Sequence, residues 1–247
     1  MSTSKIAARA AMENRNKVES LFSEKASKWY EKYSAGGPLR SRLHAFGERL
    51  SEFVKPPAKI LDLGCGTGNL AGFLTVHGYT VTACDITEKM ITRAQEANAG
   101  APIDWFLLPA DWRELPFAST TFDAILASSV FEYLSDVPRV FSECHRTLRP
   151  GGILIATVPN PKNLVRKLEK IFRPMVIAMS LMPLLRRIPK LESYATYLKC
   201  SQHRVAMDQW FSLGKEAQLL PLARDGKEKQ NRENNPPLVF ILFRKSQ

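Results

Sequence analysis

One stretch of the chain combines an apolar run, an acid and three glycines at alternate positions. Asp62 lies inside the apolar run 58–63, which predicts a buried parallel strand, and it is followed by Gly64, Gly66 and Gly68. Glycine is needed where a backbone turns sharply or meets a ligand, because a Cβ would clash there. A strand, a glycine-rich turn and a helix N-terminus together form a nucleotide-sized site at the carboxyl end of a sheet.

Two ligand classes compete for this turn: a dinucleotide such as NAD, and S-adenosylmethionine. A dinucleotide site has the spacing Gly-x-Gly-x-x-Gly, and Asp62 would repel a pyrophosphate. The same acid can hold the ammonium of an amino-acid-like ligand, directly or through water. Asp85, at the end of the next strand, suits the ribose of either ligand, and Asp111 can accept from an exocyclic adenine amine. Trp112 fits an adenine contact or the edge of the core. The set favours S-adenosylmethionine.

The same residues belong to an ordered series of motifs that resembles the class I S-adenosylmethionine-dependent methyltransferases. The series comprises Ile-Leu-Asp-Leu-Gly-Cys-Gly-Thr-Gly at 60–68, Cys-Asp-Ile-Thr at 84–87, Ala-Asp-Trp at 110–112, Phe-Asp-Ala-Ile-Leu-Ala-Ser-Ser-Val-Phe-Glu-Tyr-Leu at 122–134 and Leu-Arg-Pro-Gly-Gly at 148–152. The resemblance covers roughly residues 58–160. Within this family, the chain looks most similar to the small-molecule branch that contains the ubiquinone-biosynthesis O-methyltransferases. It implies S-adenosyl-L-methionine as the cofactor.

The resemblance also implies which residues hold the cofactor. Glycine-rich backbone would lie against the methionine part, and the two downstream acids would take the ribose and the adenine. Ser128 would line the sulfonium side, with Phe131 close by. An N-terminal arginine reaches the cofactor carboxylate in the ubiquinone-type relatives, and Arg42 is the nearest candidate, although the local sequence departs from their pattern. The expected cofactor-binding set is Asp62, Gly64, Cys65, Gly66, Gly68, Asp85, Ile86, Asp111, Trp112, Ser128, Phe131 and Arg42.

Strands that alternate with helices must position these residues. Alternation implies an α/β fold with a Rossmann-like, doubly wound and mostly parallel sheet, helices on both faces and, in this family, an antiparallel last strand. The predicted strands are 58–63, 80–84, 103–108, 122–128, 153–158, 217–222 and 238–243. We expect one domain over 1–247, divided into an N-terminal helical cap (1–57), a cofactor-binding core (58–159), a helical lid or insertion (160–205), and a C-terminal helix with strands (206–247).

Composition is typical of a globular protein with a sizeable core. The 247 residues are 45% hydrophobic and 24% charged, and no apolar stretch reaches the ~18 residues of a membrane-spanning helix. The N-terminus leads into no hydrophobic signal segment, so we expect a cytoplasmic protein. The cysteines of the chain are scattered and lack the close spacing of metal ligands, which predicts free thiols and no metal site.

The net charge of +11 is concentrated in one segment. Between residues 162 and 190 the segment contains many lysines and arginines, and Glu169 is its single acid. The basic residues flank the apolar run 175–185. That run could form a lid over a hydrophobic acceptor, an interfacial helix on anionic lipid, or a buried helix. The interfacial alternative predicts peripheral contact with an anionic membrane through 172–190.

The predicted reaction is methyl transfer to a small, lipophilic or aromatic acceptor, at oxygen in preference to carbon or nitrogen. An in-line displacement mainly needs alignment, and a hydroxyl acceptor must also lose its proton. His203, between the insertion and the next helix, is the best-placed candidate base. The alternative function is an RNA-binding methyltransferase or cofactor-bound RNA-binding module that uses 162–190. Phe172 is the single aromatic side chain of that segment, so stacking platforms are scarce and nucleic acid is not the expected partner.

Overall fold

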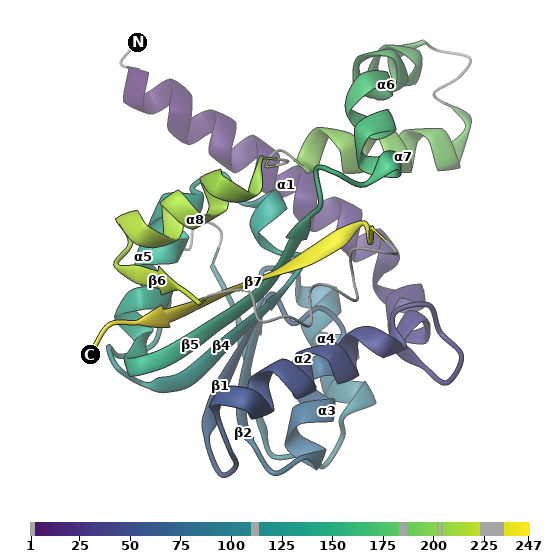
Figure 1. The fold of residues 1–247 in the computed structure, drawn as a ribbon. Coiled ribbons are helices and arrows are strands. Elements are labelled where there is room, and N and C mark those ends of the chain that lie inside the picture. Colours follow the sequence, from purple (N-terminus) through teal and green to yellow (C-terminus); the bar gives the residue numbers. More distant parts are fainter. Residues whose placement is uncertain (1–2, 110–113, 183–186, 202, 204, 223–234) are drawn as a thin grey trace.

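A seven-stranded sheet forms the centre of the protein (Figure 1). The computed structural model describes residues 3–109, 114–182, 187–201, 203, 205–222 and 235–247, with the backbone alone for 3–11. The strands, in the order of the chain, are β1 (Lys59–Leu63), β2 (Thr80–Asp85), β3 (Ile103–Leu107), β4 (Phe122–Ser128), β5 (Leu148–Pro159), β6 (Leu219–Pro221) and β7 (Leu238–Lys245).

The strand order is β3-β2-β1-β4-β5-β7-β6. Strands β1 to β5 pair in parallel, whereas β7 is antiparallel to both β5 and β6. The structure therefore confirms the predicted doubly wound sheet with an antiparallel last strand. The order reverses between β1 and β4, so the connections leave these neighbours in opposite directions and open a crevice at their carboxyl ends.

Helices cover both faces of the sheet. The helices are α1 (Thr3–Trp29), η1 (Tyr30–Tyr33), α2 (Arg40–Phe53), α3 (Asn69–Val76), α4 (Glu88–Ala97), η2 (Phe131–Tyr133), α5 (Val137–Thr147), α6 (Leu164–Leu181), α7 (Pro189–Cys200) and α8 (Met207–Glu216). One core packs Phe46 of α2 and Leu74 of α3 against the sheet. The other packs Phe141 of α5 and Trp210 of α8 against the opposite face. Strands buried on both faces explain the continuous apolar runs of the sequence.

Strand β5 begins earlier than predicted. The stretch Leu-Arg-Pro-Gly-Gly at 148–152 reads as a turn, yet Leu148 pairs with Phe122 of β4. The register shifts between Phe122 and Ala124, and Gly151 has φ +75°. A glycine in the left-handed region lets the extra residues bulge out while the strand continues.

Two helical segments meet at the carboxyl edge of the sheet. Helix α1 packs on α4 and α7, and α6 packs on α7, so that α6 projects from the body in Figure 1. In the described part of the run 175–185, the side chains of Met175, Leu181 and Met182 are 51%, 70% and 53% exposed. These exposures contradict the alternative in which this run is a buried helix. Among the described helices, none combines the length and the hydrophobicity needed to cross a bilayer.

Candidate cofactor and acceptor site

The turn after β1 has the backbone conformation for which its glycines are required. Gly64 and Gly68 have φ +70° and +72°. A Cβ at Gly64 would overlap the Val130 side chain, and one at Gly68 would meet Trp105. The N–H groups of Gly64 and Cys65 donate to the Cys84 carbonyl at 2.8 and 2.9 Å. The end of β2 therefore holds the turn in place.

Asp85, at the end of β2, binds the backbone of the glycine-rich turn. Its Oδ2 accepts from the Gly66 N–H and its Oδ1 from the Thr87 N–H, both at 2.9 Å. Burial raises the pKa of the Asp85 carboxyl, and the two N–H donors offset part of that effect. Each carboxylate oxygen retains a second lone pair. Asp85 can thus order the turn and still accept hydrogen bonds from a ligand.

Asp62 lies in a setting that is unfavourable for a lone charge. Its side chain is 1% exposed, and burial, followed by the nearby Asp85 charge, raises its pKa to about 7. Its Oδ2 has no hydrogen-bond donor among the residues that the structure describes. A buried acceptor without a donor is costly and calls for a ligand or water that donates to it. A cationic ligand would satisfy this oxygen and stabilise the ionised carboxylate.

A cavity of about 1110 Å³ extends from this turn along the carboxyl edge of the sheet. One part of its wall comes from the strand ends and from the first residues after them. The other part comes from α1, η1, the start of α2, η2, α5 and α7. The apolar members of that second wall include Val18, Phe22, Leu134, Val140 and Tyr197.

The N-terminal segment covers the glycine-rich turn. A Cβ at Gly66 would lie 3.7 Å from the Trp29 indole nitrogen. The Lys32 ammonium lies 4.1 Å from the centroid of the Trp29 ring, and both residues line the cavity with Arg42. Burial, followed by the Arg42 charge, lowers the pKa of Lys32. No ion pair joins Lys32 or Arg42 to an acid in the described part of the chain. Two adjacent cations without an acid can attract an anionic group.

Residues 61–156 match the family model described as a methyltransferase domain. The chain carries a methyltransferase domain. The match confirms the predicted family for these residues.

Curated relatives of this methyltransferase domain include methyltransferases of ubiquinone and menaquinone biosynthesis. The chain is 37% identical over 115 residues to a malonyl-[acyl-carrier protein] O-methyltransferase of Erwinia pyrifoliae, covering 45% of this chain and 42% of that protein. It is 32% identical over 140 residues to a ubiquinone biosynthesis O-methyltransferase of Chromobacterium violaceum, covering 53% and 57%. A ubiquinone/menaquinone biosynthesis C-methyltransferase of Cereibacter sphaeroides is 33% identical over 156 residues, covering 58% and 61%. The chain thus spans about half the length of these relatives.

Solved structures share the fold of the methyltransferase domain and its surroundings. An S-adenosylmethionine-dependent methyltransferase from Mesorhizobium loti superposes with a TM-score of 0.56 at 19% identity, over 80% of this chain and 96% of that one. At this level of identity the likeness establishes the architecture, in agreement with the predicted fold class.

Most of the predicted cofactor residues of the methyltransferase domain line the cavity. They are Asp62, Gly64, Cys65, Gly66, Asp85, Ile86 and Ser128, together with Arg42 of the N-terminal segment. Gly68 instead precedes α3 as its N-cap residue and lies against Trp105. Asp111 and Trp112 lie outside the described residues.

Phe131 occupies a different place from the one predicted. Its side chain is fully buried, and its ring packs against Phe141 and Trp210 with centroids 4.9 and 6.2 Å away. It is therefore a core residue that packs η2 against α5 and α8, and it does not line the cavity.

His203 also departs from its predicted role beside the acceptor. Its ring Nε2 lies 2.7 Å from the Leu134 carbonyl oxygen, and its backbone N–H donates to the Glu132 carbonyl at 3.3 Å. A carbonyl oxygen can only accept, so Nε2 carries the proton and donates. His203 is not among the residues that line the cavity. Instead, it holds the turn that contains η2.

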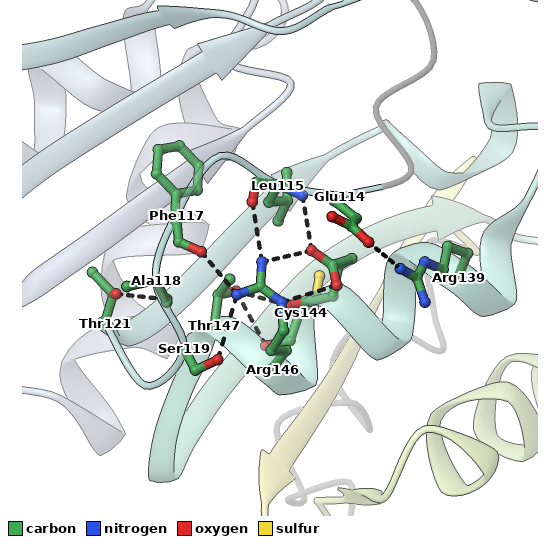
Figure 2. Close-up of polar contacts among 11 residues, drawn as sticks. Glu114, Leu115, Phe117, Ala118, Ser119, Thr121, Arg139, Cys144, Arg146 and Thr147 are labelled. Carbon is green, nitrogen blue, oxygen red and sulfur yellow. Dashed lines mark hydrogen bonds and ion pairs between the residues drawn. The ribbon is translucent and has the colours of Figure 1, made fainter.

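A polar network on α5 fixes the segment that leads into β4 (Figure 2). Arg146 donates to the carbonyls of Phe117 and Leu115 at 2.8 and 3.0 Å, and it pairs with Glu143 at 2.7 Å. Glu143 also accepts from the Leu115 N–H at 2.8 Å. Burial alone would raise the pKa of Glu143, but the Arg146 and Leu115 donors outweigh it and lower the pKa. The network therefore anchors the chain just after the predicted adenine contacts.

A second cluster closes the far end of the cavity. Arg166 of α6 donates to Glu169 at 2.8 Å, to the Tyr197 hydroxyl, and to the Pro237 carbonyl at 3.2 Å. It thus connects α6, α7 and the segment before β7. No motif in the sequence indicates Arg166, Tyr197 or Trp29, which all lie outside the matched residues 61–156.

Proposed function

We propose that this protein transfers the methyl group of S-adenosyl-L-methionine to a small, lipophilic or aromatic acceptor, with oxygen as the favoured atom. The observation that carries the proposal is the buried carboxylate of Asp62, whose Oδ2 has no donor in the described chain, at the wall of a 1110 Å³ cavity. A cofactor with an ammonium group supplies the missing donor.

In this proposal, different residues of the cavity bind different groups of the cofactor. Asp62 holds the ammonium, and the adjacent cations of Lys32 and Arg42 hold the carboxylate. Asp85 accepts from the ribose hydroxyls while it orders the Gly66 backbone. When bound, the cofactor supplies an activated methyl group, and the protein supplies orientation and the exclusion of water.

The second wall of the cavity supports a lipophilic acceptor. Its side chains come from α1, η2 and α7, and they include Phe22 and Tyr133, whose rings meet edge to face at 5.1 Å. Aromatic walls of this kind favour flat or apolar ligands. The preference for oxygen rests on the two relatives whose names give O-methylation. The third relative named above is a C-methyltransferase.

Calorimetry followed by product identification tests this function. The protein is first titrated with S-adenosylmethionine, and then incubated with the methyl-labelled cofactor and a bacterial lipid extract. Mass spectrometry identifies the labelled products. We expect saturable binding and an O-methylated lipophilic product. The absence of cofactor binding would contradict the proposal, and label on hydrophilic products alone would contradict its acceptor class.

We further propose that α6 brings the protein to an anionic membrane surface. Large apolar side chains of α6 are exposed: Leu164, Val165, Leu168, Ile171, Phe172, Met175 and Leu181. Lysines and arginines alternate with them, among them Lys167, Lys170 and Arg173. An exposed helix with apolar and basic side chains is suited to insertion at the interface of anionic lipid.

Vesicle flotation measures this contact. We expect the protein to float with vesicles that contain phosphatidylglycerol, and to float far less with pure phosphatidylcholine. Phe172→Glu should reduce flotation at least about tenfold, because it removes buried apolar area and adds a repelled charge. Val76→Glu, at an exposed apolar position of α3, is the matched control. Equal flotation of both variants would contradict the role of α6, whereas salt-sensitive RNA retention without flotation would support the nucleic-acid alternative.

A further inference from the structure

One arginine of the cavity wall makes no hydrogen bond within the described part of the chain. Arg15 of α1 lines the cavity, and its Nε is buried without a partner there. The ion pair between Arg15 and Glu19 spans 3.9 Å, which is too long for a hydrogen bond, and the Glu19 side chain is 41% exposed. A guanidinium has five N–H donors in a planar fork, so Arg15 retains donors for a ligand.

The other cations of the cavity wall already have a partner or a proposed one. Arg166 and Arg139 pair with acids at 2.8 and 3.1 Å. Lys32 and Arg42 hold the cofactor carboxylate in the proposed function. Within the described lining, Arg15 is therefore the cation that remains for the acceptor.

Helix α1 places Arg15 at the end of an apolar stripe. Val18 and Phe22 follow it by three and seven residues, so the three side chains share one helix face, and all of them line the cavity. Trp29, at the end of the same helix, lies beside Gly66 of the glycine-rich turn. With a rise of about 1.5 Å per residue, Arg15 lies about 10 Å along the helix from Phe22 and about 20 Å from Trp29. The stripe thus runs from the cofactor end of the cavity to the cation.

The wall beside Arg15 is held in place, and its acids leave the cation unpaired. The Asn14 side chain donates to the Tyr133 carbonyl at 3.2 Å, which joins α1 to η2 next to Arg15. Glu132 and Asp136 also line the cavity, and within the described residues neither forms an ion pair with Arg15. A fixed cation selects ligands by the position of their charge.

We infer that Arg15 binds an anionic group of the acceptor, a carboxylate or a phosphate monoester, and that an apolar body separates this group from the oxygen that is methylated. The inference rests on the proposed function and narrows its acceptor class to an amphipathic acid. The apolar body lies along Val18 and Phe22, and the guanidinium fork is suited to two parallel hydrogen bonds with either anion. The anion stays bound while the distant oxygen reacts, so the methylated product remains an acid.

Label transfer to fractions of a lipid extract tests this acceptor class. A bacterial lipid extract is separated by anion exchange into an acidic and a neutral fraction, and each is incubated with the protein and methyl-labelled S-adenosylmethionine. We expect the wild-type protein to label the acidic fraction at least about tenfold faster, and the labelled products to bind the anion exchanger again. Alkaline phosphatase then distinguishes the two anions, because it removes the charge of a phosphate monoester and leaves that of a carboxylate.

Variants of Arg15 connect this preference to the cavity wall. In Arg15→Gln, the amount of acidic fraction needed for half-maximal rate should rise about tenfold with little change in the maximal rate, because the lost contact is remote from the reacting oxygen. Arg15→Lys keeps the charge but not the fork, and should retain part of the affinity. Lys28→Gln, at an exposed position of α1 that does not line the cavity, is the matched control. The calorimetric Kd for the cofactor should change less than about twofold in all three variants.

Several outcomes would overturn the inference. Equal rates in Arg15→Gln and Lys28→Gln would do so, as would equal labelling of the neutral and acidic fractions by the wild-type protein. A weaker cofactor Kd in Arg15→Gln would assign the arginine to the methyl donor instead. Labelled products that no longer bind the anion exchanger would show that the acid itself is methylated. Wild-type protein that binds no cofactor, or labels neither fraction, would instead contradict the proposed function.

Discussion

Replacing Asp85 with alanine should weaken S-adenosylmethionine binding about 1,000-fold, or about 4 kcal/mol. The substitution removes two kinds of interaction at once. It deletes the proposed acceptor of the ribose hydroxyls, and it leaves the Gly66 and Thr87 N–H groups without the oxygens that order the glycine-rich turn. Titration calorimetry of the purified variant gives this ratio directly.

Asp104→Ala is the matched control for this loss. Asp104 is an acid on the neighbouring strand β3, but it is exposed and does not line the cavity. Its replacement should leave the cofactor Kd unchanged within about twofold. An Asp85→Ala protein that folds and binds the cofactor as tightly as the control would show that β2 does not hold the ribose.

Affinity for S-adenosylmethionine should rise about 15-fold between pH 5.5 and pH 7.0. Burial raises the pKa of Asp62 to about 7, so below this pH the free protein holds a proton on that carboxyl. Binding of an ammonium requires the ionised form, and binding therefore expels the proton. The ionised fraction of a group with a pKa near 7 grows by about this factor over the interval.

Calorimetry in buffers of different ionisation enthalpy measures the expelled proton. Asp62→Asn should weaken binding about 100-fold at neutral pH, because it removes a buried ion pair, and it should flatten the dependence on pH. A wild-type affinity that does not change with pH over this interval would contradict the contact between Asp62 and the ammonium.

The same pKa makes one contribution to the pH dependence of the stability of the ligand-free protein. A carboxyl whose pKa is higher in the folded state than in the unfolded state stabilises the fold while it is protonated. That contribution is complete below the unfolded pKa of about 4 and is lost as the pH rises through about 7. The cofactor should consequently raise the melting temperature more at pH 8 than at pH 6, where Asp62 must first lose its proton.

The sheet could be predicted from sequence because its signals are local. Continuous apolar runs mark strands that are buried on both faces, and β4, Phe122–Ser128, has the predicted bounds. Acids and glycines at the strand ends mark the cofactor edge for the same reason. The strand that was predicted least well is β5, whose bulge at Gly151 depends on its partner Phe122. Pairing between distant segments is not readable from one of them.

The acceptor side could not be predicted to the same degree. Trp29, Lys32 and Tyr197 reach the cavity through the packing of helices that are far apart in the chain. The helical period shows that a residue such as Val18 faces inward, but it does not show what lies opposite. His203 illustrates the limit, because its residue type suggests a base, whereas its contacts with Glu132 and Leu134 make it a brace for the turn.

The two walls of the cavity come from different parts of the chain. Residues that would bind the methyl donor can therefore change independently of residues that would bind the acceptor. In the proposed function, strand ends within 61–156 serve the methyl donor, while α1 and α7, outside that range, supply Phe22 and Tyr197. Substitutions in the second set can retune acceptor choice while donor affinity is preserved. Under the proposed function, a lineage could therefore exchange one acceptor for another by altering its helices, while the sheet edge continued to bind the common donor.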